Sequence, residues 1–318
     1  MATRARKAGS AVRVYRAERI LIGAIAIAAA PCLAQSDGNA PLVLELPAST
    51  RALGLGGAFV LSAVDNDAVF YNPGLLDAAR GAGLAVQRYG SSSTLGVLSA
   101  ATEWFGGGLA LGVQVLSYGA GGVAWDDIPD DANDLLSSGS SGASELVGSL
   151  GYGREILGFR AGIVGKAIEQ RLGGERDATV AFDIGVVRNL WGVTLGASAQ
   201  NLGWGLSIGG GDLPLPSRVT IGAATRSRPV GPLDVLVTTS VSRRRDGEII
   251  PAGGLEIAWW PIVGRTFMGR VGARRVPGDG ASPVTVGFAF RADDLTIEYA
   301  FEEFDAPGAA HRLGVRWH

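Results

Sequence analysis

Two stretches near the end of the chain decide the fold. Residues 284–303 read VTVGFAFRADDLTIEYAFEE, and residues 309–317 read AAHRLGVRW. Large apolar side chains recur at every second position of these stretches, and small or charged side chains occupy the positions between them. Because successive side chains of a β-strand point to opposite faces, this period of two predicts strands with one apolar face and one mixed face.

The chemistry of the two faces indicates which kind of sheet they belong to. A soluble sandwich also alternates, with its apolar face turned inward. In this chain one register collects the large apolar and aromatic residues, while the other holds small residues and charges of both signs, which is typical of lipid outside and a polar or packed lumen inside. A charge facing lipid at the midplane costs about 2–4 kcal/mol, so we expect the charges to face inward or to lie near a rim. These residues are Arg270, Arg274, Glu298, Glu302, Arg312 and Arg316.

The same period recurs upstream, in segments separated by turn residues. The segments are 82–89, 94–102, 107–118, 144–152, 158–168, 178–189, 192–201, 217–227, 233–243, 252–260, 265–275, 283–291, 295–304 and 309–317. An even number of strands is usual in a closed single-chain barrel. We therefore predict an all-β fold, a closed antiparallel transmembrane β-barrel of about 14 strands.

The connections and the tryptophans suggest how such a barrel would lie in a membrane. Short connections, such as 90–93, 153–157 and 292–294, are expected on the periplasmic side, and longer ones, such as 119–143, on the outside. Five tryptophans at or near predicted strand ends are expected in interfacial aromatic girdles. They are Trp104, Trp191, Trp259, Trp260 and Trp317.

The composition fits a barrel better than a cytosolic globule. The chain has 318 residues, 47% of them hydrophobic, and 49 glycines, about twice the ordinary glycine share of roughly 7%. Glycine is unfavourable in helices but is accepted in curved, closely packed strands. The net charge is only −2 and the basic residues are scattered, so nucleic acid is not an expected partner.

The first residues predict export. Six basic residues precede the apolar run ILIGAIAIAAA at 20–30, which is typical of a secretory signal peptide and too short to span the roughly 30 Å of hydrocarbon. Pro31 does not suit a lipoprotein site at Cys32, the single cysteine. We predict a signal peptide at 1–34, an N-terminal hatch or plug segment at 35–80 and the barrel at 81–318, with the protein in the cell outer membrane.

The segment before the barrel does not alternate and carries a family resemblance. The runs RALGLGGAF at 51–59, DNDA at 65–68 and YNPGL at 71–75 resemble the N-terminal signature of the PorV/PorQ family and the hatch of FadL-type fatty acid transporters. The resemblance is close here and loose over the rest of the chain. It departs at Gly74, where alanine is usual and where glycine is expected to loosen the corner, and at His318, which follows the terminal aromatic residue.

The resemblance implies a fourteen-stranded barrel with a plug in its lumen, and it leaves two functions open. FadL relatives carry hydrophobic small molecules, whereas PorV relatives are components of type IX secretion that dock cargo proteins. We expect passage of hydrophobic small molecules across the outer membrane, with type IX secretion as the alternative. The expected partners are accordingly outer-membrane lipid and either a hydrophobic ligand or secretion-system proteins, around a monomeric barrel. The gate residues carried over from the resemblance are Phe59, Phe70, Tyr71, Asn72, Pro73 and Gly74.

The residue inventory argues against catalysis. The only histidines are His311 and His318, and neither a GxSxG elbow nor an HExxH helix is present. Adjacent carboxylates such as Glu302 and Glu303 would point to opposite faces of a strand and could not act on one bond. We therefore expect no enzyme activity, no catalytic residues, no cofactor and no metal site.

Overall fold

The computed structural model describes residues 41–61, 65–89, 93–118, 143–208, 210–276, 281–304 and 308–318. The predicted signal peptide at 1–34 lies outside these residues, and so does the side chain of Phe59.

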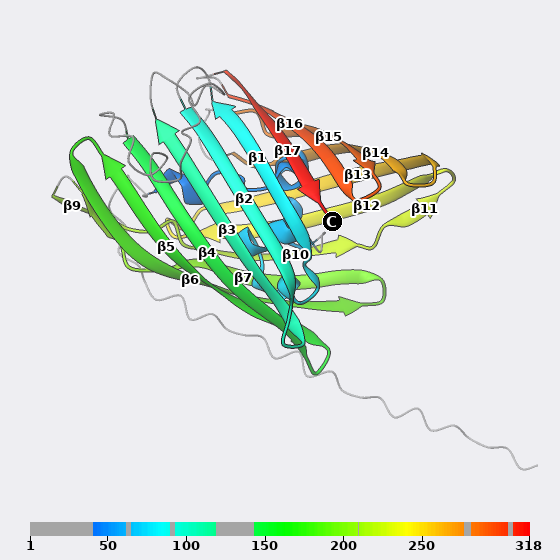
Figure 1. Cartoon of the computed structure of the whole chain (residues 1–318), viewed down its shortest axis with the longest axis horizontal. Helices are drawn as coiled ribbons and strands as arrows, with labels where there is room; N and C mark the ends of the chain where they lie inside the picture. Colours follow the sequence, from blue (N-terminus) through cyan, green and yellow to red (C-terminus); the bar gives the residue numbers. More distant parts are fainter. Residues whose placement is uncertain are drawn as a thin grey trace, which may run out of the picture. The chain divides into compact units, whose positions relative to one another are not determined.

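The predicted fold class is confirmed, because the strands form a closed antiparallel wall (Figure 1). Each strand pairs with its neighbours in the sequence, β1 pairs with β17, and β10 pairs with β12. The wall strands are β1 (Gly81–Tyr89), β2 (Ser93–Trp104), β3 (Gly107–Tyr118), β4 (Ala143–Ile156), β5 (Phe159–Leu172), β6 (Glu175–Leu190), β7 (Val193–Gly203), β10 (Arg218–Thr225), β12 (Leu233–Arg244), β13 (Ile249–Ile262), β14 (Arg265–Arg274), β15 (Val284–Ala292), β16 (Leu295–Glu303) and β17 (Ala309–Trp317).

Three shorter strands complete the described part of the chain. β11 (Arg228–Val230) continues the pairing of β10 with β12, so the circuit has fourteen strands when β10 and β11 count as one. β8 (Leu206–Ile208) and β9 (Gly211–Leu213) form a separate hairpin. This hairpin could not be predicted from the sequence, because three residues are too few to show a period of two.

The alternation sorts charges inward and apolar side chains outward, as predicted. Glu298, Glu302, Arg270, Arg312 and Arg316 are all buried, and Arg274 pairs with Glu302 at 2.8 Å. Outward residues such as Phe288 and Leu313 are exposed by 60% and 62% of their surface. An outer surface of this kind is typical of a barrel in contact with lipid.

The two ends of the barrel differ. The short β2–β3, β4–β5, β6–β7, β13–β14 and β15–β16 connections share one end with the start of β1 and the close of β17, and we call it the turn end. All five predicted girdle tryptophans lie there. The opposite end is the loop end.

One predicted connection was assigned to the wrong side. The connection at 90–93 was predicted to share the periplasmic side with the turn-end connections because it is short. Antiparallel pairing of Tyr89 with Ser93 instead places the β1–β2 connection at the loop end, together with the long β3–β4 connection. Connections alternate strictly between the ends of such a barrel, so strand order decides the side and length does not.

Three consecutive turns at the turn end have the same unusual backbone. Phe105, Leu157 and Trp191 have φ of 43°, 53° and 49°, and the glycine after each also has a positive φ. Two central residues with positive φ define a type I′ hairpin turn, which prefers Asn, Asp or Gly at its first position. The left-handed conformation costs other residues roughly 1–2 kcal/mol.

Residues 41–80, here called the lumenal segment, form short helices: η1 (Leu42–Leu44), α1 (Thr50–Gly54), η2 (Ala58–Leu61), η3 (Asn66–Phe70) and η4 (Pro73–Ala78). The Ser49 hydroxyl caps α1 by accepting a hydrogen bond from the Ala52 N–H at 3.3 Å. α1 contacts β14 to β17, η2 contacts β7, β10, β12 and β13, and η4 contacts β2 to β7. A segment that touches a closed wall on opposite sides lies within the lumen (Figure 1). In the described part of the chain, no helix is long and apolar enough to cross a membrane.

Candidate functional site

Inward-facing glycines of the wall make room for the lumenal segment. A Cβ atom at Gly112 would lie 2.5 Å from the Phe70 ring, and one at Gly153 would lie 2.7 Å from the Pro73 carbonyl oxygen. On the other side of the barrel, Gly254 faces Leu55 in the same way. The wall glycines that touch the lumenal segment are Gly83, Gly108, Gly112, Gly151, Gly153, Gly162, Gly185, Gly196, Gly254, Gly272, Gly287 and Gly314. Part of the high glycine content is therefore explained by the space that the lumenal segment needs against the wall.

The corner at Asn72 to Gly74 is packed tightly against β5, β6 and β7. The Asn72 side chain accepts a hydrogen bond from the Gly74 N–H at 2.9 Å and donates one to the Ala197 carbonyl at 3.3 Å. A Cβ at Gly74 would lie 2.9 Å from the Arg160 carbonyl oxygen. The expectation that glycine loosens this corner was wrong, because its missing side chain lets the corner approach the wall more closely.

Most of the predicted gate residues come together in this buried stretch. Phe70, Tyr71, Asn72, Pro73 and Gly74 are all buried. The Tyr71 hydroxyl accepts hydrogen bonds from the Ala48 and Ser49 N–H groups, each at 3.0 Å, and Gln200 donates to the Phe70 carbonyl at 2.8 Å. These contacts join the corner to the start of α1 and to β7.

An ion network holds the other side of the lumenal segment, and its pairings were not predicted from the sequence. It comprises Arg51, Asp65, Asp67, Glu256, Arg270, Glu298 and Arg316. Arg51 lies 2.7 Å from Glu256, and Arg270 lies 2.7 Å from both Glu256 and Glu298. Arg316 pairs with Asp65 of the segment and with Glu298 of the wall. Burial raises the pKa of the Asp67 carboxyl, and the positive charge of Arg316 opposes that shift.

Arg312 holds the backbone that precedes α1. Its guanidinium is fully buried and donates to the carbonyls of Pro47 and Ala48 at 2.8 and 2.6 Å. It also donates to the Thr50 hydroxyl at 3.1 Å and to Gln87 at 3.2 Å. Five donors in a rigid fork suit this kind of multiple contact. Charged residues on β13, β14, β16 and β17 thus hold the lumenal segment around α1 and at Asp65 and Asp67.

The inner face of β2 to β5 carries apolar and polar side chains together. Its buried apolar residues are Leu95, Val97, Ala110, Leu116, Val147, Val164 and Ile168, and its buried polar residues include Ser99, Gln114, Glu145, Ser149 and Lys166. Towards the loop end, η1 packs against this lining, because Glu145 accepts from the Val43 N–H at 2.6 Å and Gln114 donates to the Val43 carbonyl at 3.1 Å. The apolar side chains of this face pack in one cluster with residues of the lumenal segment, among them Val43 and Leu44.

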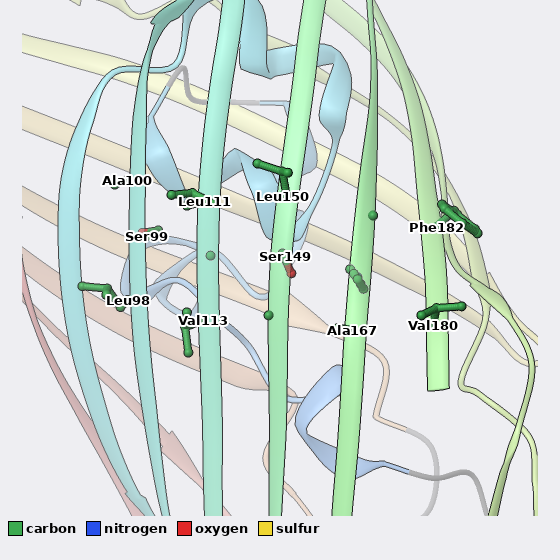
Figure 2. A pocket seen from close by; sticks show the side chains of 14 residues that line it. Leu98, Ser99, Ala100, Leu111, Val113, Ser149, Leu150, Ala167, Val180 and Phe182 are labelled. Atoms are coloured by element: carbon green, nitrogen blue, oxygen red, sulfur yellow. The ribbon is translucent and has the colours of Figure 1, made fainter. Parts of the chain in front are cut away.

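The outer face of the same wall carries an apolar depression of about 680 Å³. Outward side chains border it, among them Leu98, Leu111, Leu150 and Phe182 (Figure 2). Gly148 and Gly165 contribute no side chain to its floor, and a Cβ at either position would meet nothing within 4 Å. On the inner side of these strands, Gly112 and Gly151 face Phe70 and Leu76, so the wall here is little thicker than its backbone.

Comparisons with known proteins bear on the fold. No protein-family model matches the chain, and no curated protein matches it either. Among solved structures, the Pseudomonas putida toluene transporter TodX aligns at 12% identity over 84% of this chain and 96% of its own, with a TM-score of 0.53. The monoaromatic hydrocarbon channel CymD aligns at 10% identity over 85% and 96%, with a TM-score of 0.52. A Pseudomonas aeruginosa FadL homologue aligns at 11% identity over 86% and 98%, with a TM-score of 0.49.

These likenesses define the class of fold. At 10% and 12% identity, the matches to CymD and TodX show that this chain shares the barrel fold of hydrocarbon channels. The narrower resemblance to PorV and PorQ stays a prediction. In the described part of the chain, no group of three or more His, Cys, Asp or Glu residues is placed to hold a metal ion.

Proposed function

We propose that this protein is an outer-membrane channel for small hydrophobic molecules, with the lumenal segment as its gate. The observation that carries the proposal is the group of buried apolar side chains on the inner face of β2 to β5, at Leu95, Leu116, Val147 and Ile168. Such a lining gives an apolar molecule a path that a polar solute would not favour, because burying an unpaired polar group is costly. Opening the gate and passing along the path break no covalent bond, so no catalytic residues are proposed.

The two ends give the path a direction. Short turns are typical of the periplasmic side of an outer-membrane barrel, and longer loops are typical of the outside. On that rule the apolar lining beside η1 faces the entrance, and the corner at Asn72 to Gly74, packed against Gly153, Gly162 and Gly185, lies on the way to the periplasm. An entering molecule would have to displace η1 first and this corner afterwards.

Two further features support a hydrophobic substrate. TodX is described as a toluene transporter and CymD as a monoaromatic hydrocarbon channel, and both share this fold. The outer depression between Leu98 and Phe182 is apolar and lies behind a wall that is thin at Gly112 and Gly151. It would offer an apolar molecule contact with lipid beside the lumen.

Uptake of an apolar dye tests the proposal. Cells with a lipopolysaccharide-covered outer membrane would express the protein and receive N-phenyl-1-naphthylamine, whose fluorescence rises in apolar surroundings. We expect faster uptake than in cells without the protein, with no gain for a polar dye of similar size. Equal uptake of both dyes would contradict selectivity. No dye uptake together with co-purified secretion proteins would favour the type IX secretion alternative.

The Asn72→Ala variant is expected to speed uptake of the apolar dye. It removes the side chain that caps η4 at Gly74 and bonds the Ala197 carbonyl, and losing a cap costs about 1 kcal/mol. The barrel should still insert, as judged by a folded band that migrates faster than the boiled one on gels. The matched control is Asn189→Ala, which removes an exposed asparagine bonded to Thr194 at 2.8 Å and should leave uptake unchanged. Loss of the folded band with Asn72→Ala alone would show a purely structural role.

A further inference from the structure

Three neighbouring turns at the turn end display apolar side chains to the surroundings. Phe105, Leu157 and Trp191 are exposed by 78%, 94% and 89% of their surface. They lie on the consecutive β2–β3, β4–β5 and β6–β7 connections. Since successive hairpins are separated by two strand spacings, the three tips span about 20 Å along the rim.

The fold itself does not call for these side chains. Each occupies the first position of a turn with positive φ, where Asn, Asp or Gly is preferred. The β15–β16 turn at the same end has Asp293 at a φ of 50°, which matches that preference. Phe105, Leu157 and Trp191 therefore add backbone strain and exposed apolar surface together, and contact with something outside the barrel would offset both.

The tips continue the outward aromatic surface of the wall. The Phe105 ring contacts the Trp104 ring with centroids 4.7 Å apart, and Trp104 contacts Tyr152 at 6.2 Å. Trp104 and Tyr152 occupy outward positions close to the ends of β2 and β4. Aromatic side chains at such positions belong at the boundary between hydrocarbon and headgroups.

Arginines stand among these apolar tips without carboxylate partners. Arg188 lies over the Phe159 ring at 4.4 Å. Arg154 and Arg228 are exposed, and their guanidinium groups lie 3.9 and 3.1 Å from where a Cβ would stand at the turn glycines Gly106 and Gly192. The ion pairs of the described residues include none of the three. A guanidinium binds phosphate through a fork of parallel hydrogen bonds. The patch thus combines apolar tips with free cations, which complements a phospholipid surface.

We propose that the three turns anchor the barrel in the headgroup layer of the periplasmic leaflet, with Arg154, Arg188 and Arg228 binding lipid phosphates. The occupant is phospholipid, because the patch continues the lipid-facing wall and carries the charge that phosphates require. This inference rests on the membrane location in the proposed function but not on transport.

The anchor would set the depth of the outer depression. Phe182 at its border and Trp191 at the tip lie nine residues apart on one hairpin, which is about 20–25 Å along the membrane normal for a strand tilted by roughly 40°. With Trp191 among the headgroups, the depression falls near the middle of the roughly 30 Å of hydrocarbon.

A fluorescent label at one tip tests the anchor. Leu157→Cys and Asp293→Cys, each in a Cys32→Ser background, would carry an NBD label in vesicles of phosphatidylethanolamine and phosphatidylglycerol. Nitroxide near the lipid headgroup should quench the label at 157 at least threefold more strongly than the label at 293. Aqueous iodide should show the opposite order. Asp293 is the matched control because it has the same backbone sign of φ at the same end.

Two outcomes would overturn the proposal. Equal quenching by iodide at 157 and 293 would mean that the tip lies in water. Protection of 157 in native membranes but not in lipid vesicles would assign the patch to a protein partner. A second variant combines Phe105→Asn and Trp191→Asn with the label at 157. Asparagine is favoured at both turn positions, so the barrel should fold. Iodide quenching of the label should rise about threefold. Either result leaves the dye-uptake test of transport unaffected.

Discussion

Arg316→Gln is expected to release the lumenal segment from the wall while the barrel stays closed. Arg316 is the residue through which Asp65 of the segment and Glu298 of β16 share one positive charge. Its removal leaves Glu298 with Arg270 at 2.7 Å and Asp65 with Arg51 at 3.8 Å as their remaining cations. Breaking a buried pair by removing one partner costs about 3–5 kcal/mol. Hydrogen exchange measured by mass spectrometry should show protection of residues 41–79 falling at least about a hundredfold, since each 1.4 kcal/mol is a factor of ten.

Two further variants make this expectation specific. Arg51→Gln removes a charge from the segment itself, which pairs with Glu256 at 2.7 Å, and should lower protection in the same direction without altering β17. Arg176→Gln removes an ion pair with Glu169 whose arginine is 62% exposed, and such surface pairs contribute about 0–1 kcal/mol. Unchanged protection in both Arg316→Gln and Arg51→Gln would show that the ion network does not hold the segment.

Gly185→Ala is expected to displace the corner at Asn72 to Gly74 and to open the barrel to apolar dye. A Cβ at Gly185 would overlap the Asn72 side-chain oxygen and lie 2.9 Å from the Pro73 Cδ. Extra atoms in a close-packed site typically cost about 1–3 kcal/mol. We expect dye uptake several-fold above that of the unaltered protein, with the folded band retained on gels.

The matched control for that substitution lies on a strand away from the outer depression. Gly269→Ala adds the same methyl group on β14, where nothing lies within 4 Å of the new Cβ, and should leave uptake and folding unchanged. If the two variants show the same dye uptake, the close packing of Gly185 against the corner does not control passage. If only Gly185→Ala fails to fold, the close contact of Gly185 with the corner is needed for folding, and the corner does not act as a moving gate.

The wall of the barrel could be predicted from the sequence because its cause is local. Alternation is visible within each strand, and the cost of a charge in lipid fixes which face is inward. Glu298 and Arg312 were placed inside on that argument, and both are buried. The buried stretch from Phe70 to Gly74 was found through a resemblance carried by residues that lie together in the sequence.

The remaining features depend on contacts between distant residues. Arg51 and Glu256 are 205 residues apart, and only the register around the closed wall brings them together. The sequence contained one signal, which is the presence of charges in the hatch segment as well as on the inward register of β13 to β17. The role of the inward glycines could not be predicted for a similar reason. A glycine in the sequence gives no information about which distant backbone packs against it.

The measurement that tests the central claim most directly is dye uptake with the lumenal segment reversibly locked. Asn66 donates to the Ser99 hydroxyl at 2.6 Å, so cysteines at both positions, in a Cys32→Ser background, can be joined by a disulfide or a short thiol crosslinker. The gate account predicts that apolar dye uptake falls to the level of cells without the protein when the lock is closed. Reduction of the disulfide should restore it. Equal uptake through the locked and the reduced protein would contradict the account.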